Sequence, residues 1–130
     1  MIEPYETRTG RVWREADGIV RVLISAEAVQ NLTDAKENLG AAIKAGLGTK
    51  SPLLVDIRQA KMLEPEARHY YAGNALDDHF TALGLLLNAS PLGIMMGNVY
   101  MRLARHKVPL RLFQKEEDAL AWLLKQRLHT

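Results

Sequence analysis

Hydrophobic and polar residues follow two different periods along the chain, and these periods predict strands and helices in alternation. Residues 7–15 and 19–24 flank the turn sequence Ala16-Asp17-Gly18, whose glycine supplies the positive φ that a hairpin needs. Residues 52–57 and 81–87 are short, almost wholly apolar runs, which is typical of strands buried on both faces of a parallel sheet. The pattern therefore predicts an antiparallel hairpin followed by parallel strands.

Between these runs, apolar residues recur at the spacing of amphipathic helices. Thr33 is expected to cap a first helix, and Pro65 to open a second helix that runs to about Leu76. Ser90 is expected to cap a third helix. A last strand at 110–113 and a fourth helix, which begins with three acidic residues, complete the chain. The residues expected to face inward are Ala35, Leu39, Ala42, Ile43, Leu92, Met95, Met96, Val99, Leu103, Leu120, Leu123 and Leu124.

Strands that alternate with helices imply an α/β fold with right-handed crossovers. We therefore predict a mixed five-stranded sheet with an antiparallel N-terminal hairpin and four helices. A chain of 130 residues, with 48% hydrophobic and 25% charged residues, is suited to one soluble globular domain that spans residues 1–130.

Composition and charge exclude several classes of protein. The absence of cysteine excludes disulfides and thiol catalysis. The longest apolar run, 82–96, is too short and too interrupted to span a bilayer, and the polar N-terminus lacks the apolar core of a signal peptide. We expect a cytoplasmic protein without an integral membrane segment.

Four basic residues and no acid lie within residues 102–111. They suggest either a patch for an anionic partner or a solvated helix end, where cations complement the helix dipole. No aromatic residues are interleaved with them to stack on bases, so we expect no nucleic-acid partner. The four residues are Arg102, Arg105, Lys107 and Arg111.

Three segments together carry a family resemblance: "PLLVDIR" at 52–58, "SPLG…N" at 90–98 and "PLRLF…EEDALAWL" at 109–123. As a set they resemble STAS domains, the anti-sigma-factor antagonists of the SpoIIAA type, and especially small bacterial SpoIIAA-like proteins. The resemblance extends over nearly the whole chain and implies the STAS fold. It also implies a non-enzymatic regulatory module that docks on a partner protein through a strand, a loop and the helix that follows.

In the antagonist proteins that unit carries a serine or threonine that a kinase phosphorylates. This sequence has Glu64-Pro65-Glu66 there, so the standard phospho-switch is not expected. Either an acid mimics the phosphorylated state, or Glu64 caps the helix and Glu66 complements its dipole. The expected binding face for an unknown regulatory protein consists of Asp56, Arg58, Glu64, Glu66, Arg68 and His69.

Catalytic and metal-binding patterns are weak. Asp56, Glu66 and His69 suggest an acid/base set, but no nucleophile lies beside them. Residues 77–79, Asp-Asp-His, are consecutive, and zinc sites use spaced ligands, so we interpret them as a polar turn. We expect no enzyme activity, no catalytic residues, no metal and no cofactor.

The region 83–101 supports an alternative function, because it is rich in Leu, Met and Gly. The fold is distantly similar to CRAL-TRIO lipid-binding domains, which implies a small apolar molecule or a lipid as ligand. Gly93 and Gly97 are expected to let their helix lie close to the sheet or to another helix. The candidate ligand or interface residues are Ser90, Met95, Met96, Asn98 and Trp122.

Large aromatic residues suggest an oligomer. Trp122 is placed off the inward face of the last helix, and Tyr70 and Tyr71 are adjacent, so they are not expected to point inward together. A homodimer is the simplest assembly that would cover such residues. The methionines favour either a ligand cavity or ordinary core packing.

Overall fold

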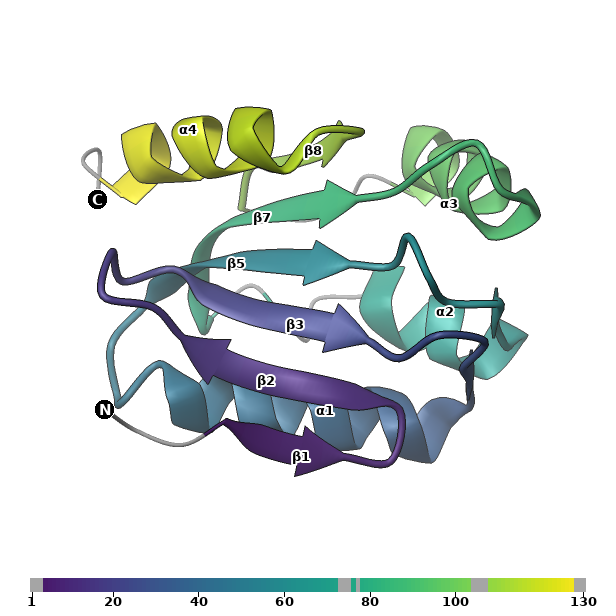
Figure 1. Cartoon of the computed structure of the whole chain (residues 1–130), viewed down its shortest axis with the longest axis horizontal. Coiled ribbons are helices and arrows are strands. Elements are labelled where there is room, and N and C mark those ends of the chain that lie inside the picture. The colour runs from purple at the N-terminus through teal and green to yellow at the C-terminus, as the bar shows by residue number, and fades with distance from the viewer. Residues whose placement is uncertain (1–3, 73–75, 77, 104–107, 128–130) are drawn as a thin grey trace.

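The computed structural model describes residues 4–72, 76, 78–103 and 108–127 (Figure 1). Six strands form one sheet in the order β1-β2-β3-β5-β7-β8, and two short strands, β4 and β6, form a separate parallel pair. The strands are β1 (Tyr5–Thr7), β2 (Gly10–Arg14), β3 (Val20–Ile24), β4 (Val29–Gln30), β5 (Ser51–Asp56), β6 (Met62–Leu63), β7 (Phe80–Leu86) and β8 (Leu110–Phe113). The helices are α1 (Leu32–Ala45), α2 (Pro65–Ala72), α3 (Pro91–Leu103) and α4 (Glu116–Arg127).

The sheet is mixed, as predicted. β1, β2 and β3 pair antiparallel, and β3, β5, β7 and β8 pair parallel. The α/β class, the N-terminal antiparallel hairpin and the four helices are therefore confirmed.

The predicted number of five strands is wrong for the main sheet, which has six. The run expected as one strand at 7–15 is split, because the chain turns at Arg8-Thr9 and Tyr5–Thr7 folds back on Gly10–Arg14. The turn spans Thr7-Arg8-Thr9-Gly10, and glycine is favoured at the last position of such a turn, so the sequence carried a turn signal that the single predicted strand ignored. β4 and β6 have two residues each, which is too short for a hydrophobic period.

Helices cover both faces of the sheet. α1 and α2 lie behind the sheet in the view of Figure 1, and together with Leu92 of α3 they close the larger hydrophobic core. α4 packs against β5 and β7 and buries Leu123 in a second core, which contains Ile19 and Leu54. The predicted inward face of α1 is confirmed, since Ala35, Leu39 and Ala42 are buried and Ile43 is half-buried; Ala35, Leu39 and Ala42 all belong to the larger core.

The cap of α1 differs from the expectation. Asn31, not Thr33, is the N-cap: its side chain accepts a hydrogen bond of 2.9 Å from the backbone N–H of Asp34. The Asp34 carboxylate accepts one of 2.9 Å from the backbone N–H of Asn31, which completes a capping box. Because this pair satisfies both amides, the helix begins before Thr33, which is exposed in the first turn.

Asp34 also links the β1–β2 turn to α1. The Arg8 guanidinium, in the β1–β2 turn, donates to Asp34 Oδ1 at 2.6 Å and to Oδ2, although Asp34 itself is buried. The hydrogen bond from Arg8 holds the pKa of the Asp34 carboxyl below its usual value. The carboxylate is therefore ionised at neutral pH and joins two elements that are distant in sequence.

Candidate functional site: an apolar cavity under α1, α2 and α3

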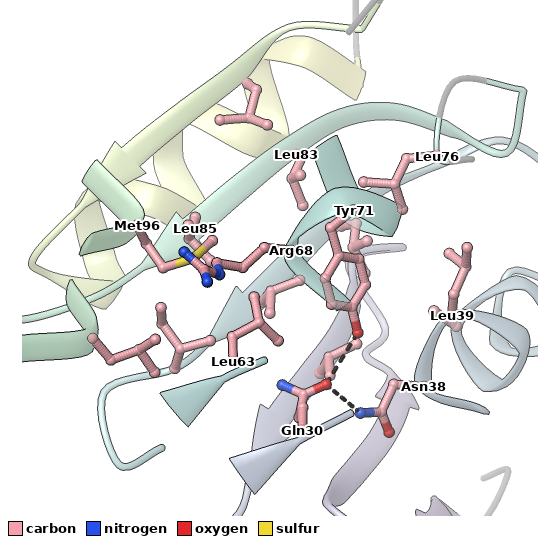
Figure 2. Close-up of a pocket in the computed structure, with 17 residues that line it drawn as sticks. Gln30, Asn38, Leu39, Leu63, Arg68, Tyr71, Leu76, Leu83, Leu85 and Met96 are labelled. Atoms are coloured by element: carbon pink, nitrogen blue, oxygen red, sulfur yellow. Dashed lines mark hydrogen bonds between the residues drawn. The ribbon is translucent and has the colours of Figure 1, made fainter. Parts of the chain in front are cut away.

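A cavity of about 100 Å³ lies between the sheet and helices α1, α2 and α3 (Figure 2). Its floor consists of two rows of neighbouring strand residues. Val22, Val55 and Leu85 are register partners across β3, β5 and β7, and Leu53, Leu83 and Leu110 are partners across β5, β7 and β8. Residues two apart on a strand share a face, so the alternation of these strands places both rows on one side of the sheet.

The walls of the cavity come from one face of each helix. α1 contributes Leu39 and Ala42, and α3 contributes Leu92 and Met96, which are spaced one turn apart. The loop strand β6 contributes Leu63, and Leu76 closes the side beyond α2. The lining is almost wholly aliphatic, so the cavity favours an apolar occupant.

Three polar side chains at one end of the cavity satisfy one another. Figure 2 shows Tyr71 of α2 directed at Gln30, and the Tyr71 hydroxyl lies 3.1 Å from Gln30 Oε1. Asn38 donates to the same oxygen at 3.1 Å and to Thr9 Oγ1 at 2.9 Å. Burial raises the pKa of the Tyr71 hydroxyl, so it stays protonated and available as a donor. These groups hold α1, α2 and β4 together.

Among the expected partner-binding residues, hydrogen bonds between side chains join Asp56 and Arg58. At the end of β5, Arg58 Nη2 lies 2.9 Å from Asp56 Oδ2, and the Arg58 backbone N–H donates to Asp56 Oδ1 at 3.0 Å. Glu64, Glu66 and His69 are exposed. Across the described ranges, no hydrogen bond or ion pair joins Asp56 to Glu66 or His69, so the structure does not assemble the acid/base set suggested by the sequence.

Two of the expected residues, Glu64 and Arg68, are joined by a backbone hydrogen bond at the start of α2. Glu64 immediately precedes the helix, and its carbonyl accepts a hydrogen bond of 3.0 Å from the Arg68 backbone N–H. Arg68 is half-buried and lines the cavity, and it is the only one of the six expected partner-binding residues to do so.

The second set of candidates is also dispersed. Ser90 caps α3, as predicted: its Oγ accepts a hydrogen bond of 3.1 Å from the Gly93 N–H. Met96 lines the cavity, Met95 packs against the larger core, and Asn98 is exposed. Trp122 lies in the other core, where its ring centroid is 5.7 Å from that of Phe113.

The tyrosine pair differs from the expectation that one ring would be left outside. Tyr70 and Tyr71 are both half-buried and both pack against the larger core, with ring centroids 5.9 Å apart. Adjacent helical residues are about 100° apart, and a broad apolar surface can contact both. These rings therefore give no support to a subunit interface.

The remaining sequence candidates that the structure describes add no second site. Asp78 and His79 lie exposed in a turn, whereas Asp77 and residues 104–107 of the basic segment lie outside the described residues. Arg111 is placed 5.5 Å from the centroid of the Phe113 ring. In the part of the chain that the structure describes, no three His, Asp or Glu side chains are grouped for a metal ion. No described helix has the length and apolarity to cross a bilayer.

Sequence reasoning missed Gln30, Asn38 and most of the cavity lining. One signal was available: Asn38 interrupts the apolar face of α1 between Ala35 and Leu39, and a polar residue on a buried face needs hydrogen-bond partners inside the protein. The cavity itself depends on strand register and helix placement, which hydrophobic periods do not specify.

Comparison with known proteins supports the fold. A family model described as a domain of unknown function (DUF7793) matches residues 12–127. No curated protein matches the sequence. The chain is similar to the crystal structure of an uncharacterized protein of the DUF3478 family with a SpoIIAA-like fold from Shewanella loihica PV-4. The two are 16% identical, the TM-score is 0.59, and the match covers 95% of this chain and 98% of that one. The SpoIIAA-like fold implied by the sequence resemblance is therefore confirmed.

Proposed function

We propose that this chain, which belongs to the DUF7793 family of domains of unknown function, is a non-enzymatic binding protein for a small apolar molecule. The observation that carries the proposal is the cavity of about 100 Å³ under α1, α2 and α3. Protein interiors are normally close-packed and contain few voids larger than a water molecule, so an aliphatic cavity of this size in a small domain favours a ligand-binding role.

The size of the cavity suggests the size of the ligand. An apolar cavity of about 150 Å³ in another protein stays dry and binds benzene. The present cavity is somewhat smaller, about 100 Å³, so it suits one small ring or a short alkyl chain. An empty cavity of this volume costs the folded state about 2 kcal/mol, and an apolar ligand would relieve that cost.

The α3 wall can adapt to different ligands. Met96 has an unbranched, flexible side chain that fills irregular spaces, and Met95 beside it is only half-buried. This wall supports binding of a class of apolar molecules rather than of one shape.

The proposal is tested by titrating the protein with n-hexanol and toluene. We expect the melting temperature to rise with ligand concentration, because a ligand that binds only the folded state stabilises it by mass action. Methyl NMR signals of Leu83, Leu85 and Met96 should shift, while those of Leu123 in the second core stay unchanged. An unchanged melting temperature, or shifts spread over both cores, would contradict the proposal.

A regulatory interaction module is the second candidate. It is supported by the SpoIIAA-like fold and by two exposed acids, Glu64 and Glu66, that flank Pro65 at the start of α2. Under this candidate the partner is a regulatory protein that recognises the negative charge at this helix start. The homodimer expected from the sequence stays a prediction, which native mass spectrometry measures.

Alanine at both Glu64 and Glu66 should change the set of proteins that the chain retains in a pull-down from its host. The matched control is alanine at Glu116 and Glu117, two exposed acids at the start of α4. An unchanged set with the Glu64/Glu66 variant, or the same change with the control, would reject this binding face. Binding of n-hexanol should be normal in both variants, so the two candidate functions are tested separately.

A further inference from the structure

Arg68 places a guanidinium group at an otherwise apolar cavity. In Figure 2 its side chain runs from α2 toward Leu85 and Met96, which line the same cavity. Arg68 is half-buried, and its Nε atom is buried. The Nε atom of a side chain that carries a permanent charge is thus held at an aliphatic cavity.

Arg68 also lacks a partner for this buried donor. No side chain or backbone atom of the described ranges accepts a hydrogen bond from Arg68 Nε. Four other arginines of the described chain form ion pairs with carboxylates: Arg8 with Asp34, Arg11 with Glu6, Arg21 with Asp17, and Arg58 with Asp56. Arg21 Nε is also buried without an acceptor, but that guanidinium pairs with Asp17 through Nη2. A buried N–H without an acceptor is unfavourable, so Arg68 Nε calls for an explanation.

The described lining of the cavity contains no acidic side chain. Its other polar side chains, Gln30, Asn38 and Tyr71, hydrogen bond to one another, and none of them carries a negative charge at neutral pH. The remaining lining is aliphatic. An occupant with an acceptor oxygen would supply the hydrogen bond that Arg68 Nε lacks within the described residues.

We propose that the ligand is an amphiphile whose alkyl or aryl part fills the cavity and whose anionic oxygen head group is bound by Arg68. The planar guanidinium presents paired N–H donors that match a carboxylate or a phosphate bidentately, and such a charge-assisted pair is strongest where water is excluded. This inference rests on the proposed binding of apolar molecules and adds the chemical class of the ligand to it. Carboxylate and phosphate share this recognition chemistry, so the experiment includes both.

The test compares ligands with the same alkyl chain and different head groups: n-hexanol, hexanoate and hexyl phosphate. We expect at least one of the two anions to bind the unmodified protein about tenfold or more tightly than n-hexanol, measured by NMR titration. Arg68→Met should remove this preference, so that this variant binds both anions no more tightly than it binds n-hexanol. The anion that binds more tightly identifies the head group as carboxylate or phosphate.

One control variant and one control measurement test for indirect effects. Arg58→Met removes an arginine that is paired with Asp56 outside the cavity, and it should keep the preference for the anion. Retained n-hexanol binding by Arg68→Met shows that its cavity is intact. Equal affinities for n-hexanol and both anions in the unmodified protein would overturn the role of Arg68 while leaving apolar binding in place. Absence of binding by all three ligands would overturn both proposals.

Discussion

Replacing Gly93 with alanine should destabilise the protein by about 3 kcal/mol, because there is no room for a side chain at this position. A Cβ atom built on Gly93 would lie 1.8 Å from the carbonyl oxygen of Asn88 and 3.0 Å from its carbon. Both are backbone atoms in the turn between β7 and α3, so they cannot rotate away as a flexible side chain would. The first turn of α3 has to move, and with it Leu92, which is buried in the larger core. Urea denaturation measures the loss.

Gly97→Ala is the matched control on the same helix. A Cβ atom there has no neighbour within 4 Å, so alanine should stabilise the helix by about 0.5–1 kcal/mol through its better helix propensity. Opposite signs for the two variants are expected. Destabilisation of equal size at both positions would mean that a general intolerance of α3 to substitution, and not the contact with Asn88, sets the result.

Val55→Phe should abolish n-hexanol binding and at the same time raise the stability of the unliganded protein by about 1 kcal/mol. Val55 lies in the floor of the cavity between its register partners Val22 and Leu85, and its side chain is only half-buried. A phenyl ring at this position extends into the empty volume and gains contacts that the valine lacks. Thermal unfolding and NMR titration of one sample measure both effects.

Val29→Phe is the control for the change in side-chain size. Val29 is 41% exposed on β4 and does not line the cavity, so the substitution should leave n-hexanol affinity unchanged. If Val55→Phe bound n-hexanol as well as the unmodified protein, the ligand would have to bind elsewhere. Loss of binding in both variants would point to a general effect of the added ring.

The central part of the fold was predictable because its strand sequences consist almost wholly of apolar residues. "PLLVDI" and "TALGLLL" are apolar on both faces, and they became β5 and β7 between two helical layers. The edge strand β1 was missed because Gly10, the last residue of the turn after β1, was placed in the interior of one longer strand. The cap of α1 was misplaced by two residues because Thr33 is a good cap in isolation, whereas Asn31 and Asp34 form the reciprocal pair.

The candidate site was less predictable than the fold. Arg68 was assigned to the face that docks on a partner protein, because the resemblance to STAS domains implies that the strand, loop and helix at this place carry that face. The direction of the Arg68 side chain depends on the rotation of α2 against the sheet, which the packing of Ala67 and Tyr71 determines. The pairing of Val22 with Val55 and Leu85, which builds the cavity floor, depends on strand register.

The polar end of the cavity extends to the edge of the sheet. From the Tyr71 hydroxyl, hydrogen bonds continue through Gln30 and Asn38 to Thr9, and the Thr7 hydroxyl of β1 donates to Asn38 Oδ1 at 2.5 Å. Each side chain in this series is oriented by the next. An occupant that turned Tyr71 would also change the hydrogen bonds that Asn38 makes with Thr7 and Thr9 in the β1–β2 hairpin. If this change altered how a partner pairs with the open edge of β1, thermodynamic reciprocity requires that the partner change ligand affinity by the same factor. One series of hydrogen bonds thus joins the polar end of the cavity to the first hairpin of the sheet.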